Sequence, residues 1–255
     1  MNGYCPLASG SKGNCIYFGT KETKILIDAG ISGMATKKKL EEIDVDLKEI
    51  QAIVISHEHT DHIDGLKTLA FRYGIPVFAN SDTAKGIYST LGLCPQFKIF
   101  TTGEKFTIGD IDIHPFSIQH DTADPVAFTL KANGFKIGIC TDLGFPTTLV
   151  RSHLKECDYL MVEANHEPSM VHASSRPQIY KQRVLGRSGH LSNEECALLL
   201  SEVMGENLKH IHLAHLSQEC NAEATALEVV KKKIGDRVEI TIAPQYKIGK
   251  PIYFI

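Results

Sequence analysis

The sequence predicts an α/β protein in which mixed β-sheets are covered by helices. Short apolar, β-branched stretches are interleaved with segments of helical periodicity, and the strands gather in two halves of the chain. Residues 111–117, 126–132 and 135–140 are close enough in the chain to pair antiparallel, and Asn133-Gly134 is a strong signal for a two-residue hairpin. A mixed sheet system with helical covering layers follows from these observations.

Each element is expected from its own local pattern. Strand-like stretches lie at 15–19, 24–28, 52–56, 77–79, 105–108, 111–117, 126–132, 135–140, 159–163, 210–214 and 239–243. Helical patterns fill 32–43, 62–73, 82–91, 147–154, 177–186, 193–204 and 222–233. Ser192-Asn193-Glu194-Glu195 is a capping box, so a helix is expected to begin just after His190.

Length and composition are those of an ordinary globular chain. The 255 residues are 43% hydrophobic and 22% charged, and no Pro/Gly/Ser-rich linker divides them, so we expect one domain over 1–255. No apolar run approaches the roughly 18 residues of a membrane helix, and the N-terminus does not resemble a signal peptide. Seven cysteines without a CxxC pair favour reduced thiols in the cytoplasm. A net charge of −3 means that any polyanion must be held locally.

A dense group of metal-binding side chains occupies six residues of the chain. His57, His59, Asp61 and His62 directly follow the apolar stretch 51–56, which is predicted to be a buried strand. Imidazole and carboxylate suit zinc, manganese or iron, and a carboxylate among histidines favours a reactive site over a closed structural one. The end of a strand is also the usual place for chemistry in an α/β sheet. A solvated His-rich turn is the alternative.

The string His57-x-His59-x-Asp61-His62 resembles the signature of the metallo-β-lactamase superfamily. Four other residues fall in that family's order, namely Asp28 at the end of an earlier strand, His120, Asp142 and His215. The resemblance implies an αββα sandwich of two β-sheets flanked by helices, with metals at its edge. It also implies that His57, His59 and His120 hold one divalent ion, that Asp61, His62 and His215 hold a second, and that Asp142 bridges the two.

Two divalent ions held close together can catalyse phosphoryl transfer. Ions about 3.5–4 Å apart can deprotonate a bridging water and hold both the attacking and the leaving oxygen of a phosphoryl displacement. We expect Asp61 to bind metal and to orient the hydroxide, and Asp28 to support the site by bonding the backbone of the histidine loop. Without the resemblance to the order of residues in that family, His120 and His215 would be interpreted as ordinary surface or core histidines. Asp142 would then be interpreted as a residue that forms the turn before Leu143-Gly144.

Three further segments suggest a subgroup. Residues 7–15, 163–167 and 189–193 are similar to the YycJ/WalJ-type bacterial proteins, which are regarded as cytoplasmic DNA exonucleases or related phosphodiesterases. His190 also resembles the histidine that tRNA 3′-processing endonucleases of this superfamily place before a Ser or Thr. The chain lacks their inserted tRNA-binding arm and the extra domain of the β-CASP enzymes, which argues against a dedicated role in RNA maturation.

Several residues are candidates for contact with substrate. His190 is expected to act as a general acid or phosphate-oxygen donor beside a helix N-terminus, with a structural histidine as the alternative. The loop residues Ser9, Ser11 and Asn14 are candidates for binding phosphate, against a plain β-turn. Asn165 and His166 are weaker candidates, against a role in loop structure.

A basic helical face is the last candidate for substrate binding. Arg176, Tyr180, Arg183 and Arg187 recur at helical spacing around residues 177–186. Such a face can follow a phosphate backbone and stack a base, although many charged faces are simply solvated.

These features lead to one main hypothesis and two alternatives. We expect a phosphodiesterase with two divalent ions (zinc, manganese or iron) that acts on nucleic acid, as an exonuclease on DNA. The chemistry follows from the ligands, and the polymer follows mostly from the resemblance. A small-molecule hydrolase of the same fold, such as a cyclic-phosphate phosphodiesterase, lactonase or thioesterase, is the first alternative. A non-catalytic, metal-stabilised scaffold is the second, and the complete ligand set argues against it.

Overall fold

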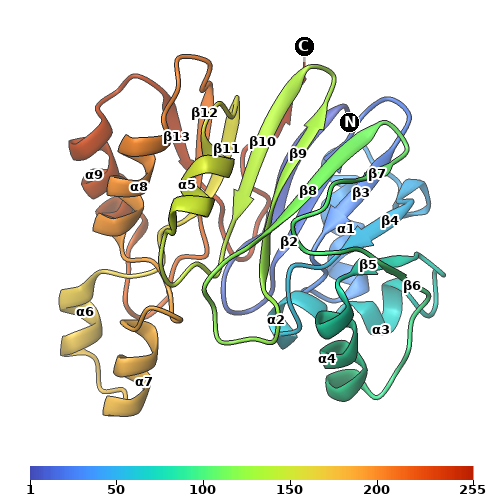
Figure 1. Cartoon of the computed structure of the whole chain (residues 1–255), viewed down its shortest axis with the longest axis horizontal. Coiled ribbons are helices and arrows are strands. Elements are labelled where there is room, and N and C mark those ends of the chain that lie inside the picture. The colour runs from blue at the N-terminus through green and yellow to red at the C-terminus, as the bar shows by residue number, and fades with distance from the viewer. Residues whose placement is uncertain (255) are drawn as a thin grey trace.

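Residues 1–254, which the computed structural model describes, contain two seven-stranded β-sheets packed face to face (Figure 1). The first sheet has the order β14 (Ile252–Tyr253), β1 (Gly3–Ala8), β2 (Cys15–Gly19), β3 (Lys24–Ile27), β4 (Ala52–Val54), β5 (Val77–Ala79), β6 (Phe97–Ile99). The second has the order β13 (Glu239–Ile242), β12 (His210–Ala214), β11 (Tyr159–Glu163), β10 (Phe135–Cys140), β9 (Val126–Ala132), β8 (Ile111–Ser117), β7 (Phe106–Ile108).

Both sheets are mixed, and they repeat one arrangement. Pairing is antiparallel from β14 to β3 and parallel from β3 to β6. In the second sheet it is parallel from β13 to β10 and antiparallel from β10 to β7. The predicted hairpin between β9 and β10 is confirmed, with φ of 53° at Asn133 and 79° at Gly134. Two positive φ angles are what a type I′ turn requires.

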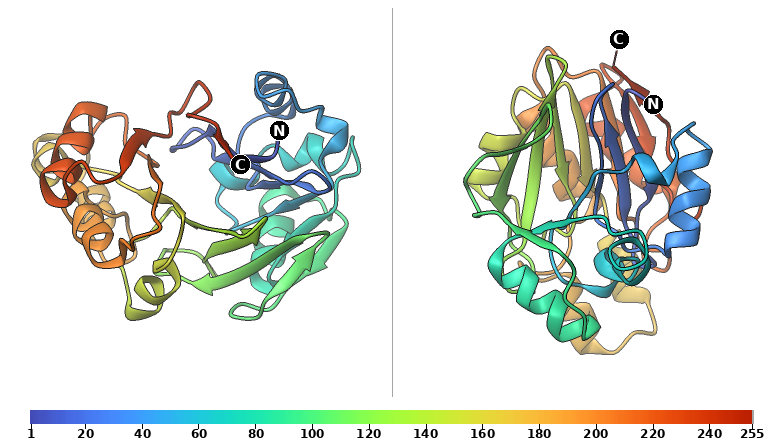
Figure 2. Two further views of the ribbon diagram at one scale, coloured as in Figure 1. Left: turned by 90° about the horizontal axis from the view of Figure 1, so that it is seen from above. Right: turned by 90° about the vertical axis from the view of Figure 1, so that its right-hand side faces the viewer.

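Helices cover both outer faces, which confirms the predicted αββα sandwich (Figure 2). Against the second sheet lie α5 (Thr148–Leu154), α8 (Asn193–Val203) and α9 (Glu223–Ile234). Against the first lie α1 (Gly33–Glu41), α3 (Leu66–Leu69) and α4 (Ser81–Leu91). Two short helices, α6 (Pro168–Ala173) and α7 (Gln178–Val184), project at one end of the sandwich (Figure 1). Within residues 1–254, no helix combines the length and the apolarity needed to cross a lipid bilayer.

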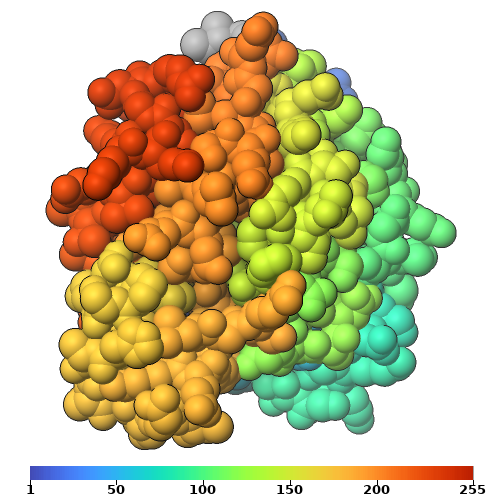
Figure 3. Space-filling model, turned by 60° about the vertical axis from the view of Figure 1, so that its left-hand side comes forward, coloured from blue at the N-terminus to red at the C-terminus, as the bar shows by residue number. Residues whose placement is uncertain are grey.

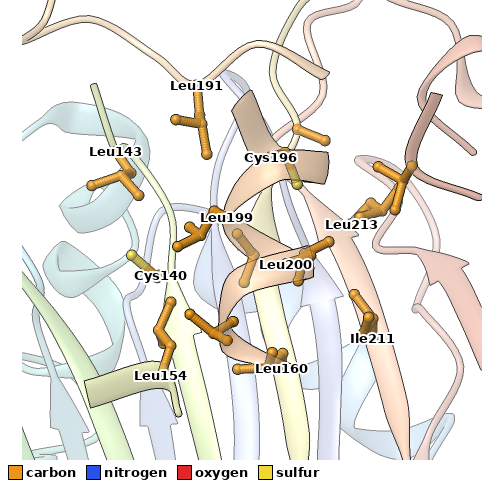
Figure 4. Packing of buried hydrophobic residues seen from close by; sticks show 14 of the residues in the cluster. Cys140, Leu143, Leu154, Leu160, Leu191, Cys196, Leu199, Leu200, Ile211 and Leu213 are labelled. Atoms are coloured by element: carbon orange, nitrogen blue, oxygen red, sulfur yellow. The ribbon is translucent and has the colours of Figure 1, made fainter. Parts of the chain in front are cut away.

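The central parallel strands β11 and β12 of the second sheet bury both of their faces. Along β11, Leu160 packs toward the helices while Tyr159 and Met161 face the other sheet. Figure 4 shows Leu199 and Leu200 of α8 beside this strand. Fully burying a leucine side chain contributes about 1.5–3 kcal/mol, so this layer holds the strand ends firmly in place. Burial on both faces also explains why β11 is apolar from Tyr159 to Val162 and does not alternate with polar residues.

One predicted helix was wrong, because residues 62–73 do not form a single helix. They are divided between α2 (Thr60–Ile63) and α3, with Gly65 between them. The Gly65 amide donates to the carbonyl of Ala29 at 2.8 Å, and a Cβ on Gly65 would lie 2.2 Å from the carbonyl oxygen of Ile31. The chain is therefore drawn against the loop after β3, and the helix is interrupted there.

Within residues 1–254, the sequence prediction also missed β1, β6, β14, α6 and the short 3-10 helix η1 (Leu47–Glu49). β1 contains Pro6, and proline cannot donate a ladder hydrogen bond, so the sequence signal for a strand is weak there. The Pro6 carbonyl accepts from Gly249, so the Pro6 nitrogen faces the same side of β1, away from β2. The N–H group that Pro6 lacks would not have pointed toward β2, so no hydrogen bond between β1 and β2 is lost.

Replacing Gly65 with alanine should destabilise the fold. The added methyl group must displace the carbonyls of Ile31 and Ala29, so we expect Gly65→Ala to lower the free energy of unfolding by about 1–3 kcal/mol. Urea unfolding followed by circular dichroism measures this change. Gly205→Ala is the matched control, because no atom lies closer than 3.9 Å to the position that its Cβ would take. Equal stability of the two variants would contradict the proposed close approach.

Candidate metal centre

The predicted ligands come together because four strands end at one edge of the sandwich. His57 follows β4, His120 follows β8, Asp142 follows β10 and His215 follows β12. Asp61 and His62 are added by the short helix α2. Loops at the carboxyl ends of parallel strands are where α/β proteins gather reactive groups. This edge lies at the bottom of Figure 1.

The predicted ligand atoms form two groups, with the carboxylate of Asp142 between them. In the first group, His59 Nδ1 lies 3.2 Å from His57 Nε2 and 3.3 Å from His120 Nε2. In the second, Asp61 Oδ2 lies 3.6 Å from His215 Nε2 and 3.7 Å from His62 Nε2. Asp142 lies between them, 3.2 Å from His62, 3.5 Å from His215 and 3.8 Å from His120. Each group of three can hold a metal ion.

Unpaired polar atoms show that these residues fit a divalent cation. Within residues 1–254, His215 Nε2 and Asp142 Oδ2 are buried without a well-formed hydrogen bond, although His62 Nε2 lies near Asp142. Buried polar atoms are normally paired, so unsatisfied ligand atoms that face one another need an explanation. A metal ion provides one, since imidazole and carboxylate are its usual ligands.

Two buried carboxylates orient the histidines from behind. Asp28 lies 2.8 Å from His62 Nδ1, and its other oxygen accepts from the backbone amide of Ser56 at 2.8 Å. This is the contact to the histidine loop that the sequence predicts. Holding Nδ1 of His62 turns its Nε2 toward the ligand cluster, which is how metal-binding histidines are commonly fixed.

Glu163, the second of these carboxylates, was missed by the sequence prediction. It is fully buried at the end of β11, and its Oε1 lies 2.8 Å from His190 Nδ1 and 2.9 Å from His215 Nδ1. Its Oε2 accepts from the amides of Leu143 and Leu191. The available signal was its position at a strand end within 163–167, but nothing local revealed its partners.

Charge around the cluster separates the histidines into two kinds. Burial lowers the pKa of His57 well below its ordinary 6.5, and burial lowers that of His59 and His120 as well. Burial opposes charge at His62 and His215 too, but neighbouring carboxylates outweigh it and raise both pKa values well above 6.5. Burial would raise the pKa of Glu163, yet the imidazoles of His190 and His215 lower it to about 2.

Three residues of the centre have a left-handed backbone. Asp28, Asp142 and His215 have φ of 59°, 57° and 55°, and each follows a strand closely. Such conformations cost of order 1–3 kcal/mol in residues other than glycine, although Asp and His tolerate them better than most. The sharp turn at each strand end directs the side chain into the centre.

A cavity of about 360 Å³ opens over the ligands and collects some of the predicted substrate residues. Ser11, Asn165, Tyr180, Arg183 and His190 line it. The side chains of Tyr180 and Arg183 come from α7, so that helix forms one wall of the cavity. The projecting segment that carries α6 and α7 is yellow in Figure 3.

The other predicted substrate residues lie away from the cavity surface. The Ser9 hydroxyl accepts from the amide of His215 at 2.9 Å, and Asn14 Nδ2 lies 3.0 Å from His62 Nε2. Both residues therefore contact predicted ligands and do not line the cavity. His166 is buried. Arg176 pairs with Glu219, and the Arg187 guanidinium lies 4.0 Å from the ring centre of Phe145. The predicted basic face is therefore divided, and only its middle part reaches the cavity.

The fold and this site define a metal-dependent hydrolase with an αββα architecture. A family model described as a beta-lactamase superfamily domain matches residues 23–213. The chain belongs to the metallo-β-lactamase superfamily.

The most informative similarities agree with this assignment. The chain is 36% identical to exodeoxyribonuclease YycJ of Bacillus anthracis over 243 residues, which cover 92% of each protein. It is 36% identical to exodeoxyribonuclease WalJ of Streptococcus pneumoniae serotype 2, over 96% of this chain and 92% of that one. The crystal structure of the metallo-β-lactamase fold protein YhfI from Bacillus subtilis has a TM-score of 0.73, with 16% identity over 96% of this chain and 97% of that one.

Metal binding should depend on pH differently in the two groups. In the metal-free protein, His62 and His215 keep a proton to well above pH 6.5, whereas His57, His59 and His120 are already neutral there. A metal binds neutral imidazole and must displace those protons. We therefore expect the ion of the Asp61, His62 and His215 group to be lost first as the pH falls, so that bound zinc decreases from two ions toward one. Calorimetric titration over a series of pH values measures it, and simultaneous loss of both ions would contradict the assignment.

Removing the charge of Glu163 should weaken metal binding. Glu163→Gln keeps the size of the side chain but no longer holds His215 and His190 by a carboxylate, so we expect metal affinity to fall about 10- to 100-fold. Competition with a chromophoric chelator measures it. Glu167→Gln is the control, because Glu167 contacts Asn193 and no predicted ligand. If the metal affinity of Glu163→Gln is unchanged, Glu163 does not orient the predicted ligand His215.

Proposed function

We propose that this chain is a phosphodiesterase with two divalent ions that removes nucleotides from the ends of DNA. The observation that carries the proposal is one cavity in which the ligand cluster faces an imidazole, a guanidinium and an aromatic ring. Its support also includes the similarity, over nearly the full length, to proteins named exodeoxyribonucleases. Seven cysteines that form no disulfide within residues 1–254 fit a reducing cytoplasm as its compartment.

The ligand cluster has the composition that phosphoryl transfer needs. In the proposal, His57, His59 and His120 would hold one ion, Asp61, His62 and His215 would hold the other, and Asp142 would serve both. Divalent zinc, manganese or iron would lower the pKa of a water molecule toward neutrality and offset the charge of the phosphate. Asp61 Oδ2 faces His62, His215 and Asn14, which leaves Oδ1 free to orient the attacking water.

His190 is the proposed general acid. Glu163 holds its Nδ1, so its Nε2 is the nitrogen available to the cavity. A proton delivered from this atom to the departing oxygen would prevent an alkoxide from accumulating. The same carboxylate contacts His215, so the acid and one ligand share a support and keep a fixed separation.

Arg183 and Tyr180 are the proposed contacts to the strand. Arg183 pairs with Asp121, and Asp121 Oδ1 lies 3.5 Å from His120 Nε2, so the guanidinium is held close to the ligands. A guanidinium has five donors in a planar fork, and those that Asp121 does not occupy can bind phosphate oxygens. The Tyr180 ring offers a stacking surface that does not depend on base identity.

End-labelled DNA tests the proposed function. The manganese- or zinc-loaded protein is incubated with single- and double-stranded DNA, with Asp61→Ala purified in parallel. We expect stepwise release of mononucleotides that disappears in Asp61→Ala. If DNA stays intact while a small phosphodiester is hydrolysed, the proposal is wrong and a small-molecule hydrolase is indicated.

Loss of the proposed acid should slow catalysis without loss of metal. We expect kcat of His190→Ala to fall about 10²- to 10⁴-fold, because the leaving oxygen no longer receives a proton. Steady-state kinetics and metal analysis of the same preparation measure the two quantities. A substrate with a strongly acidic leaving group should be affected less, and an unchanged rate on DNA would exclude His190 from the mechanism.

The two arginines at the end of the basic face should behave differently. Arg183→Ala should raise KM for DNA and reduce the salt dependence of cleavage by about one phosphate contact, because Arg183 lines the cavity. Arg187→Ala is the matched variant, since Arg187 stacks on Phe145 away from the cavity. Kinetics over a range of salt concentrations measure both. Equal effects of the two substitutions would contradict the assignment.

A further inference from the structure

A second cavity, of about 540 Å³, adjoins the metal cavity, and apart from Ser9, Leu216 and Ser217 its lining residues lie outside the predicted metal centre. The two cavities share Leu216 and Ser217, which directly follow the ligand His215. Ile242, Ala243 and Pro244 give the second cavity an apolar floor. Leu216 and Ser217 therefore form a wall common to the cavity over the predicted ligands and the second cavity.

The wall formed by residues 244–247 is fixed in place. Gln245 Oε1 accepts from the amide of Lys12 at 2.8 Å, and its Nε2 donates to the carbonyl of Gly13 at 2.9 Å. Lys39 Nζ donates to the carbonyl of Tyr246 at 3.0 Å. A Cβ on Gly10 would lie 2.6 Å from Gln245 Oε1, so the glycine loop is packed tightly against this wall. Because of these contacts, the cavity is preformed.

Tyr246 stands at the mouth of this cavity with most of its ring in solvent. Its side chain is 73% exposed, and its hydroxyl donates to Gln218 Oε1 at 3.2 Å. The aromatic ring is therefore held over the cavity although it buries little surface. Lys247 is beside it, and within residues 1–254 this lysine forms no ion pair. An open aromatic ring, an apolar floor and a free cation together suit a planar base attached to a phosphate.

We propose that this cavity is a subsite for one nucleobase of the DNA strand, with Tyr246 as its stacking platform. The inference rests on the proposed function. The base belongs to a nucleotide next to the phosphate that lies over the ligands, because the shared wall at Leu216 and Ser217 makes the two cavities continuous. Stacking on Tyr246 selects for an unpaired base and not for its identity.

Binding of single-stranded oligonucleotides tests the subsite. Fluorescence anisotropy is measured in the Asp61→Ala protein, which does not consume the probe, with a set of oligonucleotides that each carry one abasic position near an end. We expect one abasic position to raise Kd about 5- to 150-fold, the range that the loss of one stacked base predicts. Tyr246→Ala should raise Kd for the intact oligonucleotide by a similar factor.

The decisive result is the combination of the two changes. If the base stacks on Tyr246, the abasic oligonucleotide should bind Tyr246→Ala no more weakly than the intact one does. Tyr246→Phe should lose much less affinity than Tyr246→Ala, because it keeps the stacking ring and loses only the hydroxyl that donates to Gln218, and it reports on folding. Tyr253→Ala is the matched control, since Tyr253 is 56% exposed on β14 and lines neither cavity.

Two other outcomes would overturn the subsite. If the abasic position and Tyr246→Ala raise Kd by independent, additive amounts, Tyr246 contacts something other than that base, and the subsite is wrong. In that case, cleavage of DNA by the wild-type protein would still support the proposed function. If the protein neither binds nor cleaves DNA, the proposed function fails, and the subsite fails with it.

Discussion

The carboxylate of Asp142 is the interaction on which the centre depends, because it joins residues from both sheets. Asp142 follows a strand of the second sheet, yet it lies 3.2 Å from His62, which follows a strand of the first. It also approaches His120 and His215. The cluster therefore exists only when the two sheets are packed together, and the apolar layer between them is a condition for the chemistry.

Asp28 and Glu163 have matching roles in the two sheets. Each is a buried carboxylate at the end of a strand, each contacts Nδ1 of one predicted ligand, and each accepts from backbone amides of a neighbouring loop. The two sheets therefore share both a strand arrangement and the way in which a buried carboxylate supports a predicted ligand. Between them, Asp142 contacts one histidine supported by each carboxylate, His62 and His215.

Local patterns predicted those parts of the structure that are determined by local interactions. The hairpin at Asn133-Gly134, the capping box at Ser192 and most strands depend on nearby residues, and all were predictable. The interruption at Gly65 and the strand around Pro6 depend on segments distant in the sequence, and both were missed. Glu163 was missed for the same reason, since its partners are 27 and 52 residues away. Helical spacing grouped the four residues of the basic face, but partners such as Glu219 and Phe145 separate them.

The order of the ligands along the chain has a consequence for biosynthesis. The three-imidazole group is complete once His120 has been synthesised, about halfway along the chain, whereas the second group requires His215. His120 follows a strand of the second sheet, however, so synthesis of the three histidines does not bring them together until that sheet packs on the first. The complete centre, with Asp142 between its two groups, can assemble only when most of the polypeptide has left the ribosomal tunnel, so a truncated product would not carry the full set of ligands.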